Sequence, residues 1–439
     1  MASSSMWGAR IRRFIALLRG SRLCSLVSGT SGRMRNVTRP RVVLISMHVG
    51  HEGVPHAGGR YLLELQRLLD RETDLTMLTV GNRLNRESAT KPGVPRRLLL
   101  LGHESGRGPV GKVLNRAAFS ADTTYRHRRD PGMPSAAFIL GLLRSREARA
   151  AVRGADVIDL QYSESIRLVR LLRRLNPTAR ITGTFHDVMS QSFSREPQDT
   201  DEERRYWEGV AERSRGHEKA MVAQLDEVLV FSHKDAELLG GPPHTVVHPP
   251  LSDGTEPRHT PATEPVVIVV SYLARDENNK AALWTLDHVW PRVLEHRPEA
   301  RLRLVGGGVL DALRSRVDEL PAGDGVTLTG FVDDLDAEYA AAAVALVPVL
   351  QGAGVKFKTV EGLCHGVPVV TTTVGAEGIE GDDLFAGLVD DPHGLADALV
   401  SVLDDTAAQQ QRTDRVQDWA QEVYGRARFE ETIRGTWVR

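Results

Sequence analysis

A glycine-rich loop with two lysines lies between an apolar strand expected at Val344–Leu350 and a following helix. Gly352 and Gly354 let backbone N–H groups approach a ligand without a Cβ in the way, and a helix N-terminus attracts anions. Lys356 and Lys358 add compact positive charges. The loop therefore predicts a site for a phosphate group.

Glu361 stands one turn into the expected helix. A carboxylate accepts hydrogen bonds on both oxygens, which suits a pair of neighbouring hydroxyl groups. A phosphate site followed by an acceptor for a diol matches the needs of a nucleotide. We therefore expect a nucleotide to bind between the loop and Glu361.

A second group of candidates lies in the first half of the chain. His186 follows a strand expected at Ile181–Phe185, and open α/β sheets bind ligands at the C-terminal ends of strands. A capping or structural histidine is the alternative, and Asp187 beside it is expected to be an N-cap. Gly58 and Gly59 open a helix after the first strand. Their amides could contact a diphosphate, and a turn with close helix–sheet packing is the alternative.

Three other motifs are incomplete. The loop 48–57 holds three histidines without a carboxylate or thiolate at ligand spacing, which disfavours zinc. The segment Gly106–Lys112 is similar to a P-loop, but Val113 replaces the hydroxyl residue. Gly306–Gly308 lacks the third glycine and the acidic residue of a dinucleotide fingerprint. A zinc site, a P-loop and hydride transfer are therefore not expected.

Alternating strands and helices must position these residues, which is the pattern of parallel α/β sheets. In the first half we expect strands at 42–47, 74–80, 97–101, 157–160, 181–185 and 227–231, and helices at 59–69, 165–175 and 201–225. In the second half we expect strands at 266–270, 301–305, 326–328, 344–350 and 367–372, and helices at 281–294 and 310–320. The pattern predicts two Rossmann-like domains.

Domain limits follow from changes in composition. We expect a basic N-terminal arm at 1–40, a first domain at 41–250, a turn-rich linker at 251–265, a second domain at 266–411 and a C-terminal helix at 412–439. A chain of 439 residues with 41% hydrophobic content can fill two cores. A net charge of -1 argues against nucleic acid as a partner. Two cysteines favour a reducing, cytoplasmic compartment.

The basic arm allows two interpretations. Its charged side chains are all arginines, and its apolar runs are too short to span a bilayer. A basic amphipathic segment would suit peripheral contact with an anionic membrane surface. Alternatively, Met34 stands just before the first strand, and the upstream residues are an untranslated or disordered leader.

The loop, Glu361 and the following Gly366–Gly378 stretch resemble the donor-site signature of glycosyltransferase family 4. The resemblance implies a GT-B fold, in which two Rossmann-like domains face each other across a cleft and the last helix crosses back to the first domain. It also implies retaining transfer of a hexosyl-type sugar from a nucleoside diphosphate sugar to a hydroxyl acceptor, which would be a glycan, a lipid-linked acceptor or a small molecule. The nucleotide sugar is then a co-substrate, and no cofactor is expected.

The resemblance also assigns roles to residues. In the family, two glutamates separated by seven residues bind the ribose and the transferred sugar; the second is Glu361, and the first position falls on Ala353. This departure matches a subgroup with a Gly-x-Gly-Val-Lys-x-Lys loop. His186 would contact the donor sugar or support the transition state, and Gly58 and Gly59 would lie opposite the lysines.

Further family landmarks lie in the second half. Arg275 or Lys280 would meet the diphosphate, Gly307 would bring its backbone close to it, and Val332 would offer main-chain groups to the base. Preorganised amides with Lys356 and Lys358 would stabilise the leaving diphosphate. No Asp-x-Asp pair follows a strand in the first domain, so we expect no bound metal.

Two other functions remain open for a chain of this type. A GT-B nucleotide-sugar epimerase or phosphorylase would share the fold but act on the free nucleotide sugar or on phosphate. A non-catalytic partner protein would bind nucleotide only, with Ala353 marking loss of the sugar site. The presence of Glu361 and of both lysines argues against the second.

Overall fold

The computed structural model describes residues 39–102, 113, 117–118, 120, 122, 132–196, 199–260 and 262–437. Most of the basic arm and the P-loop-like segment Gly106–Lys112 lie outside the described residues. From Arg39 onward the chain forms one compact unit. None of the helices described has an apolar run of the length that crossing a bilayer requires.

In the described part of the chain, the first sheet has seven parallel strands in the order β3-β2-β1-β4-β5-β6-β7. The strands are β1 (Arg41–Ile45), β2 (Asp74–Val80), β3 (Leu98–Leu101), β4 (Val157–Gln161), β5 (Arg180–Phe185), β6 (Glu227–Val230) and β7 (Thr245–Val246). The helices that accompany them are α2 (Ala57–Glu72), α3 (Arg83–Ser88), α6 (Ala136–Arg144), α7 (Arg146–Gly154), α8 (Tyr162–Ile166), α9 (Val169–Leu175), α10 (Met189–Ser194), α11 (Asp201–Val222) and α12 (His233–Leu239). Central strands such as β1 are apolar on both faces, as a covered parallel sheet requires.

The second sheet has six parallel strands within residues 262–437, in the order β10-β9-β8-β11-β12-β13. The strands are β8 (Val266–Val270), β9 (Arg301–Val305), β10 (Val326–Gly330), β11 (Val344–Val347), β12 (Val369–Thr371) and β13 (Gly387–Leu388). The α-helices are α13 (Asp276–Trp284), α14 (Trp290–His296), α15 (Asp311–Asp318), α16 (Leu335–Ala340), α17 (Phe357–Cys364), α18 (Pro392–Asp404), α19 (Gln410–Val423) and α20 (Arg426–Trp437). A π-helical turn, Thr285–Val289, joins α13 to α14, and 3-10 turns lie at Ala322–Asp324 and Ala407–Gln409.

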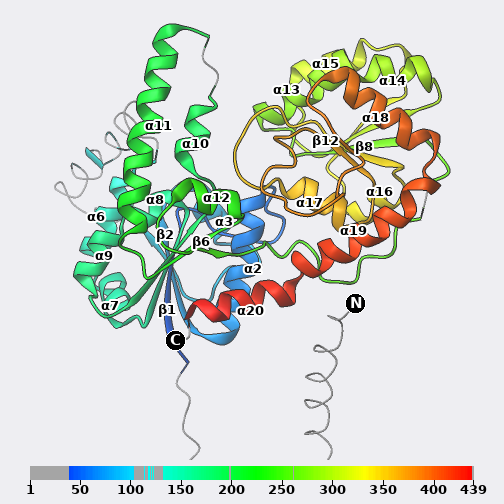
Figure 1. Cartoon of the computed structure of the whole chain (residues 1–439). Helices are drawn as coiled ribbons and strands as arrows, with labels where there is room; N and C mark the ends of the chain where they lie inside the picture. Colours follow the sequence, from blue (N-terminus) through cyan, green and yellow to red (C-terminus); the bar gives the residue numbers. More distant parts are fainter. Residues whose placement is uncertain are drawn as a thin grey trace, which may run out of the picture. The chain divides into compact units, whose positions relative to one another are not determined.

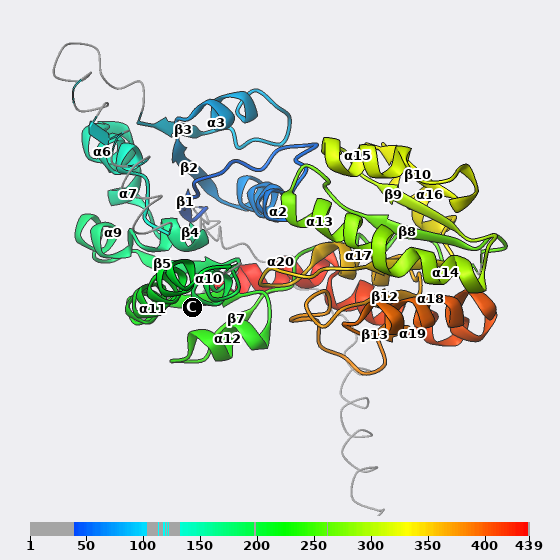
Figure 2. The ribbon, with the colours of Figure 1, turned by 90° about the horizontal axis from the view of Figure 1, so that it is seen from above.

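Helices cover both faces of the first sheet. Figure 2 shows α6, α7 and α9 on one face and α2 with α20 on the other. Phe138 of α6 and Leu172 of α9 pack with Ile45 and Ile158 of the sheet, whereas Leu65 of α2 packs on the opposite face. The core is therefore a helix–sheet–helix sandwich, in which strand ends rather than strand faces are open for function.

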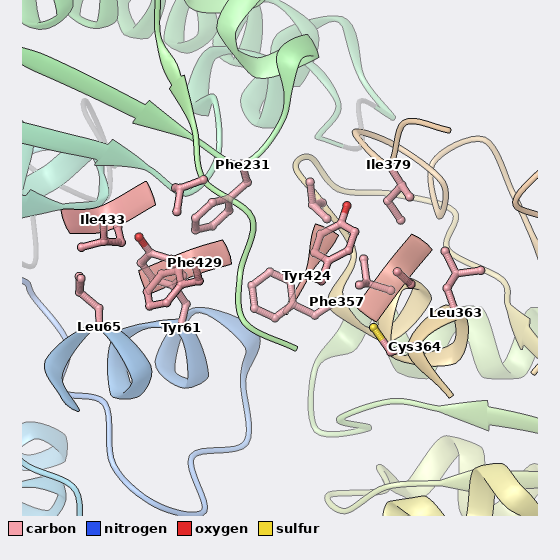
Figure 3. Packing of buried hydrophobic residues seen from close by; sticks show 14 of the residues in the cluster. Tyr61, Leu65, Phe231, Phe357, Leu363, Cys364, Ile379, Tyr424, Phe429 and Ile433 are labelled. Atoms are coloured by element: carbon pink, nitrogen blue, oxygen red, sulfur yellow. The ribbon is translucent and has the colours of Figure 1, made fainter. Parts of the chain in front are cut away.

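The last helix returns to the first sheet, as the red ribbon in Figure 1 shows. Arg434 of α20 pairs with Glu72 of α2 at 2.7 Å, and the ring centroids of Phe429 and Tyr61 are 5.6 Å apart. Figure 3 shows that this packing belongs to a larger apolar cluster, which continues through Tyr424 and Phe357 to Leu363 and Cys364. One hydrophobic cluster thus joins residues of both sheets.

The two parallel sheets match the fold that the sequence predicts, and the main differences are local. The helix expected at 165–175 is interrupted, because Arg167 and Leu168 close turns onto Ser163 and Ser165 between α8 and α9. The helix expected at 281–294 begins earlier, at Asp276, where acidic residues in its first turn favour the helix dipole. The exact domain limits stay a prediction.

Candidate active site

The loop between β11 and α17 has the conformation that its glycines suggest. Gly352 and Gly354 have φ angles of 120° and 72°, in the region that favours glycine. Lys356 is the N-cap of α17, and no side chain caps the first turn of this helix. Amides at the start of α17 are therefore left for another acceptor, such as an anion.

The two lysines of the loop have different partners. Lys356 Nζ donates to the carbonyl oxygens of Ala353 at 3.0 Å and Gly354 at 2.6 Å. Lys358 Nζ donates to Ser271 Oγ at 3.0 Å and to an oxygen of Asn278 at 2.8 Å. Burial lowers the pKa of Lys358 to about 8, and burial also lowers the pKa of Lys356. Poorly solvated ammonium groups would gain from a bound anion.

Glu361 faces the other half of the molecule. Its side chain is only 9% exposed, and its Oε1 accepts a hydrogen bond from Arg60 Nη1 on α2. The sequence offers no local signal for this ion pair, because 301 positions separate the two residues. The pair brings α2 directly against the proposed nucleotide site.

His186 is buried at the end of β5, with 5% of its surface exposed. Its ring stacks on Tyr162, with ring centroids 3.7 Å apart, and meets Tyr61 and Phe231 edge to face. Burial, together with the nearby His48, lowers the pKa of His186 well below its usual value. The imidazole is therefore neutral at physiological pH.

Hydrogen bonds fix the tautomer of this imidazole. The side-chain amide of Gln161 donates to Asp159 and to Thr184, which orients its Oε1 toward His186. His186 Nε2 lies 2.9 Å from that oxygen and must carry the proton. Within the described residues, His186 Nδ1 is buried and has no partner. An acceptor nitrogen is thus available for a hydroxyl donor.

Gly58 and Gly59 lie at the start of α2 and are packed closely. A Cβ on Gly58 would clash with the hydroxyl of Tyr162, and one on Gly59 would clash with Val54. The N–H of Gly59 donates to His56 Nδ1 at 3.0 Å. The structure therefore explains both glycines by packing, and the Gly59 amide already has an acceptor.

The remaining sequence candidates separate into two groups. Arg275 pairs with Glu277 at 3.2 Å. Burial, together with the charges of His48 and Arg275, lowers the pKa of His56 to about 4, so Arg275 lies near the first half. Lys280 instead pairs with Asp276 at 2.7 Å on the exposed side of α13. The structure does not bring Lys280 to the other candidates.

Packing contacts fix the backbone around Gly307 and Val332, the two backbone candidates of the second half. Gly306 has a φ of 141°, and a Cβ there would clash with the carbonyl oxygen of Ser271. The carbonyl of the next residue, Gly307, accepts from the N–H of Leu273 at 2.9 Å. Val332 is partly buried against the core cluster. These contacts hold the ends of β8, β9 and β10 close together.

An ion cluster, which sequence reasoning missed, joins the halves beside the loop. Arg195 donates to both carboxylate oxygens of Glu377 at 2.8 Å and to the carbonyl of Gly352 at 2.8 Å. Lys234 also pairs with Glu377, at 2.7 Å. The Gly-Ala-Glu-Gly motif around Glu377 was a signal that could have identified one member.

Asp187 is another residue whose position was not foreseen. It does not cap α10, whose N-cap is Val188. Incomplete solvation between the halves raises the pKa of Asp187 above its usual range, and Lys356 opposes the rise. Its side chain nevertheless remains accessible to solvent. The expectation that Asp187 is a simple N-cap was wrong.

A cavity of about 280 Å³ lies beside the Arg60–Glu361 pair, and its lining includes Arg60, Glu64, Ser252, Glu256 and Phe357. The walls are mainly polar and come from α2, α16, α17, α20 and the segment that follows β7. Neither Lys356 nor Lys358 lines it. The cavity therefore adjoins the loop site without containing it.

Known proteins resemble this chain at two levels. Residues 264–405 match the family described as "Glycosyl transferases group 1". An uncharacterized 44.6 kDa protein in the cps region of Klebsiella pneumoniae is 29% identical over 117 residues, which are 26% of this chain and 30% of that protein's length. The chain thus spans less than a third of this curated relative.

Solved structures resemble nearly the whole chain. Anabaena HepE in complex with UDP-glucose aligns with a TM-score of 0.61 at 13% identity, covering 90% of this chain and 98% of that one. Sucrose-phosphate synthase from Thermosynechococcus elongatus aligns with a TM-score of 0.63 at 19% identity, covering 91% and 98%. At such identities the likeness concerns the fold, which is GT-B. The match over residues 264–405 thus agrees with the family that the donor-loop motif predicts, the group 1 glycosyltransferases of family 4.

Proposed function

We infer that the protein is a retaining, metal-independent glycosyltransferase that moves a hexosyl-type sugar from a nucleoside diphosphate sugar to a hydroxyl acceptor. The observation that carries this is the uncapped start of α17 with two poorly solvated lysines beside it. The match of residues 264–405 to group 1 glycosyl transferases and the likeness to HepE, solved with UDP-glucose, support the same donor class.

The chemistry requires the bond between the sugar's anomeric carbon and the diphosphate to break. Negative charge then builds on the departing phosphate, where preorganised amides and lysines stabilise it most. Lys358 and the α17 amides would contact the charged phosphate. Lys356 would also contact it once the phosphate replaces the loop carbonyl oxygens as the acceptor of its ammonium group. Glu361 would accept hydrogen bonds from the ribose hydroxyls, exchanging Arg60 for them.

Retention of configuration would follow from attack on the same face that the diphosphate leaves. The acceptor hydroxyl forms the new bond to the anomeric carbon, and its proton passes to the departing phosphate oxygen. His186 Nδ1 would accept a hydrogen bond from a sugar or acceptor hydroxyl. No grouping of His, Cys, Asp and Glu able to hold a metal occurs in the ranges described.

Donor binding is tested first by thermal shift with a panel of nucleotide sugars. A ligand that binds only the folded state raises stability by about 2.7 kcal/mol at one hundred times its Kd. Donors that shift the melting temperature are then incubated with and without candidate acceptors, including glycans, lipid-linked sugars and small alcohols.

The products separate the possible functions. Transfer requires an acceptor, and NMR of the product should show the anomeric configuration of the donor. Conversion of the donor sugar without acceptor would indicate an epimerase, and dependence on inorganic phosphate a phosphorylase. Binding without any turnover would indicate a non-catalytic protein. The cytoplasm, with peripheral membrane contact through the arm, is our proposed setting.

A further inference from the structure

Asp187 reaches the donor loop from the opposite half of the molecule. It stands between β5 and α10, and its neighbours His186 and Val188 are buried while its own side chain is exposed. A Cβ added to Gly354 would clash with Asp187 Oδ1. The carboxylate therefore lies directly against the loop and stays open to solvent.

Within the described residues, this carboxylate is affected by the charge of Lys356 but is bonded to no group. Among the residues described, no hydrogen bond or ion pair uses Asp187. Nearby carboxylates each have a partner: Glu377 has Arg195, Glu361 has Arg60, and Asp235 has Ser232 on one oxygen, while its buried Oδ1 has none within the described residues. Asp187 is thus an acceptor that faces the loop and remains available to a ligand.

A second unused acceptor stands next to it in the chain. His186 Nδ1 is buried and lacks a partner within the described residues. Tyr162 stacks on His186, and the charge of Asp187 also acts on Tyr162. Two acceptors beside each other suit a ligand with several hydroxyl donors, which a sugar is.

The loop cannot supply this function itself. Residues 350–356 contain no aspartate or glutamate, and Ala353 adjoins the glycine that Asp187 contacts. This stretch of the loop therefore has no carboxylate of its own, and the carboxylate of Asp187 from the first half lies against it at Gly354. The same contact would also explain why position 354 is a glycine.

We propose that Asp187 binds hydroxyl groups of the transferred sugar and so helps to select it. The inference rests on the proposed function, because it needs a nucleotide sugar at the loop. It extends that function by naming a sugar-recognising residue outside the donor half. A different role would be a counter-ion for Lys356, which would affect every diphosphate equally.

The variants Asp187→Ala and Asp187→Asn test the proposal by comparing the affinity for a nucleotide sugar with the affinity for the matching nucleoside diphosphate. Calorimetry would measure Kd for UDP-glucose and GDP-mannose and for the matching UDP and GDP. The variants should weaken binding of the preferred nucleotide sugar about tenfold or more, since a charged hydrogen bond is lost, and change binding of the matching diphosphate less than about twofold. Asp318→Asn, an exposed carboxylate on α15, is the matched control.

A deoxy-sugar series identifies the hydroxyl. The deoxy analogue that lacks the contacted hydroxyl should bind wild type more weakly, with no further loss in Asp187→Ala, because paired changes at one contact are not additive. Equal weakening of diphosphate and nucleotide sugar would overturn the proposal in favour of a counter-ion, and unchanged binding of both would overturn it outright. If wild type bound neither ligand, the proposed function itself would fail.

Discussion

The C-terminal strand ends of the two sheets lead to different functional groups. In the second sheet, the loop after β11 carries glycines with positive φ and two lysines near an uncapped helix start. In the first sheet, β4 and β5 lead to Tyr162 and His186, which stack in an aromatic cluster that includes Tyr61. One set of strand ends presents positive charge and amides, whereas the other presents a neutral imidazole acceptor in an apolar setting, beside the carboxyl group of Asp187.

This difference suggests that the two halves bind different parts of the substrates. Ammonium groups and helix amides favour phosphate oxygens. A neutral imidazole held in one tautomer favours a hydroxyl donor. We therefore expect changes in the second half to act on the diphosphate, and changes in the first half to act on the sugar and acceptor.

The largest effect is expected from Lys358→Ala. Loss of a group that stabilises the leaving diphosphate should raise the barrier by about 2–4 kcal/mol, which is a fall of roughly 30- to 900-fold in kcat/KM. Lys356→Ala should act in the same direction. Lys219→Ala, an exposed lysine on α11, is the matched control. Near-normal kcat/KM in either variant would make that lysine a structural loop residue.

Glu361→Ala should weaken binding of the nucleotide rather than destroy the fold. The loss of charge-assisted hydrogen bonds to the ribose would cost about 1.5–3 kcal/mol each. Arg60 is 43% exposed, so water can solvate it once its partner is removed. Calorimetry with nucleoside diphosphates would measure the loss, and circular dichroism would check the fold. Unaltered diphosphate affinity would remove Glu361 from the site.

His186→Ala should reduce turnover more than donor affinity. An unpaired hydroxyl in the reacting complex would cost about 1–3 kcal/mol, seen in kcat under saturating donor. His186→Asn places an amide oxygen near the position of Nδ1 and should retain more activity than His186→Gln, which mimics Nε2. If Gln restored turnover and Asn did not, the tautomer derived from Gln161 would be wrong.

Diphosphate affinity should fall at alkaline pH. Burial lowers the pKa of Lys358 to about 8 in the free protein, and a bound diphosphate would raise it. Binding is therefore strongest below pH 8, where the ammonium is charged, and should weaken by up to about tenfold per pH unit above it. Calorimetry from pH 7 to 10 measures the slope, and Lys358→Ala should reduce it to the part that comes from Lys356, whose pKa is also about 8. An equal slope in that variant would assign the titration elsewhere.

Chelation should have the smallest effect. If amides and lysines neutralise the diphosphate, turnover should continue in excess EDTA within experimental error. The measurement is initial rate with and without chelator, followed by added Mg²⁺ or Mn²⁺. Loss of activity in EDTA that added divalent metal restores would show that the amides and lysines of the second half do not neutralise the diphosphate without a metal.

Sequence reasoning is most informative where the candidate residues lie close together in the chain, and the site that they predict stays a prediction. The loop glycines, the lysines and Glu361 lie within ten positions of one another, so their spacing on a strand–loop–helix unit predicts a common site. Both parallel sheets followed from the alternation of apolar strands and helices. Short edge strands such as Thr245–Val246 were missed, because two residues carry no periodic signal.

The contacts between the halves could not be predicted in this way. Arg60 and Glu361 meet only after both sheets have formed and docked. Asp187 has the local sequence of a cap, and only its contact with Gly354 distinguishes it from one. Lys280 fits a family pattern by position, yet Asp276 one turn earlier pairs with it on the outer surface. Tertiary placement decided the first two of these cases, whereas the Lys280–Asp276 pair is a local contact within α13.

The return of α20 to α2 has a consequence for biosynthesis. Phe429 and Ile433 cover Tyr61 and Leu65, so an apolar surface of the first sheet stays exposed to the ribosome and to chaperones until residues near 430 have been made. Contacts this distant in sequence slow folding, and exposed apolar surface on a nascent chain favours aggregation. A tag or truncation that perturbs α20 would therefore be expected to lower the yield of folded protein before it affects any step of sugar transfer.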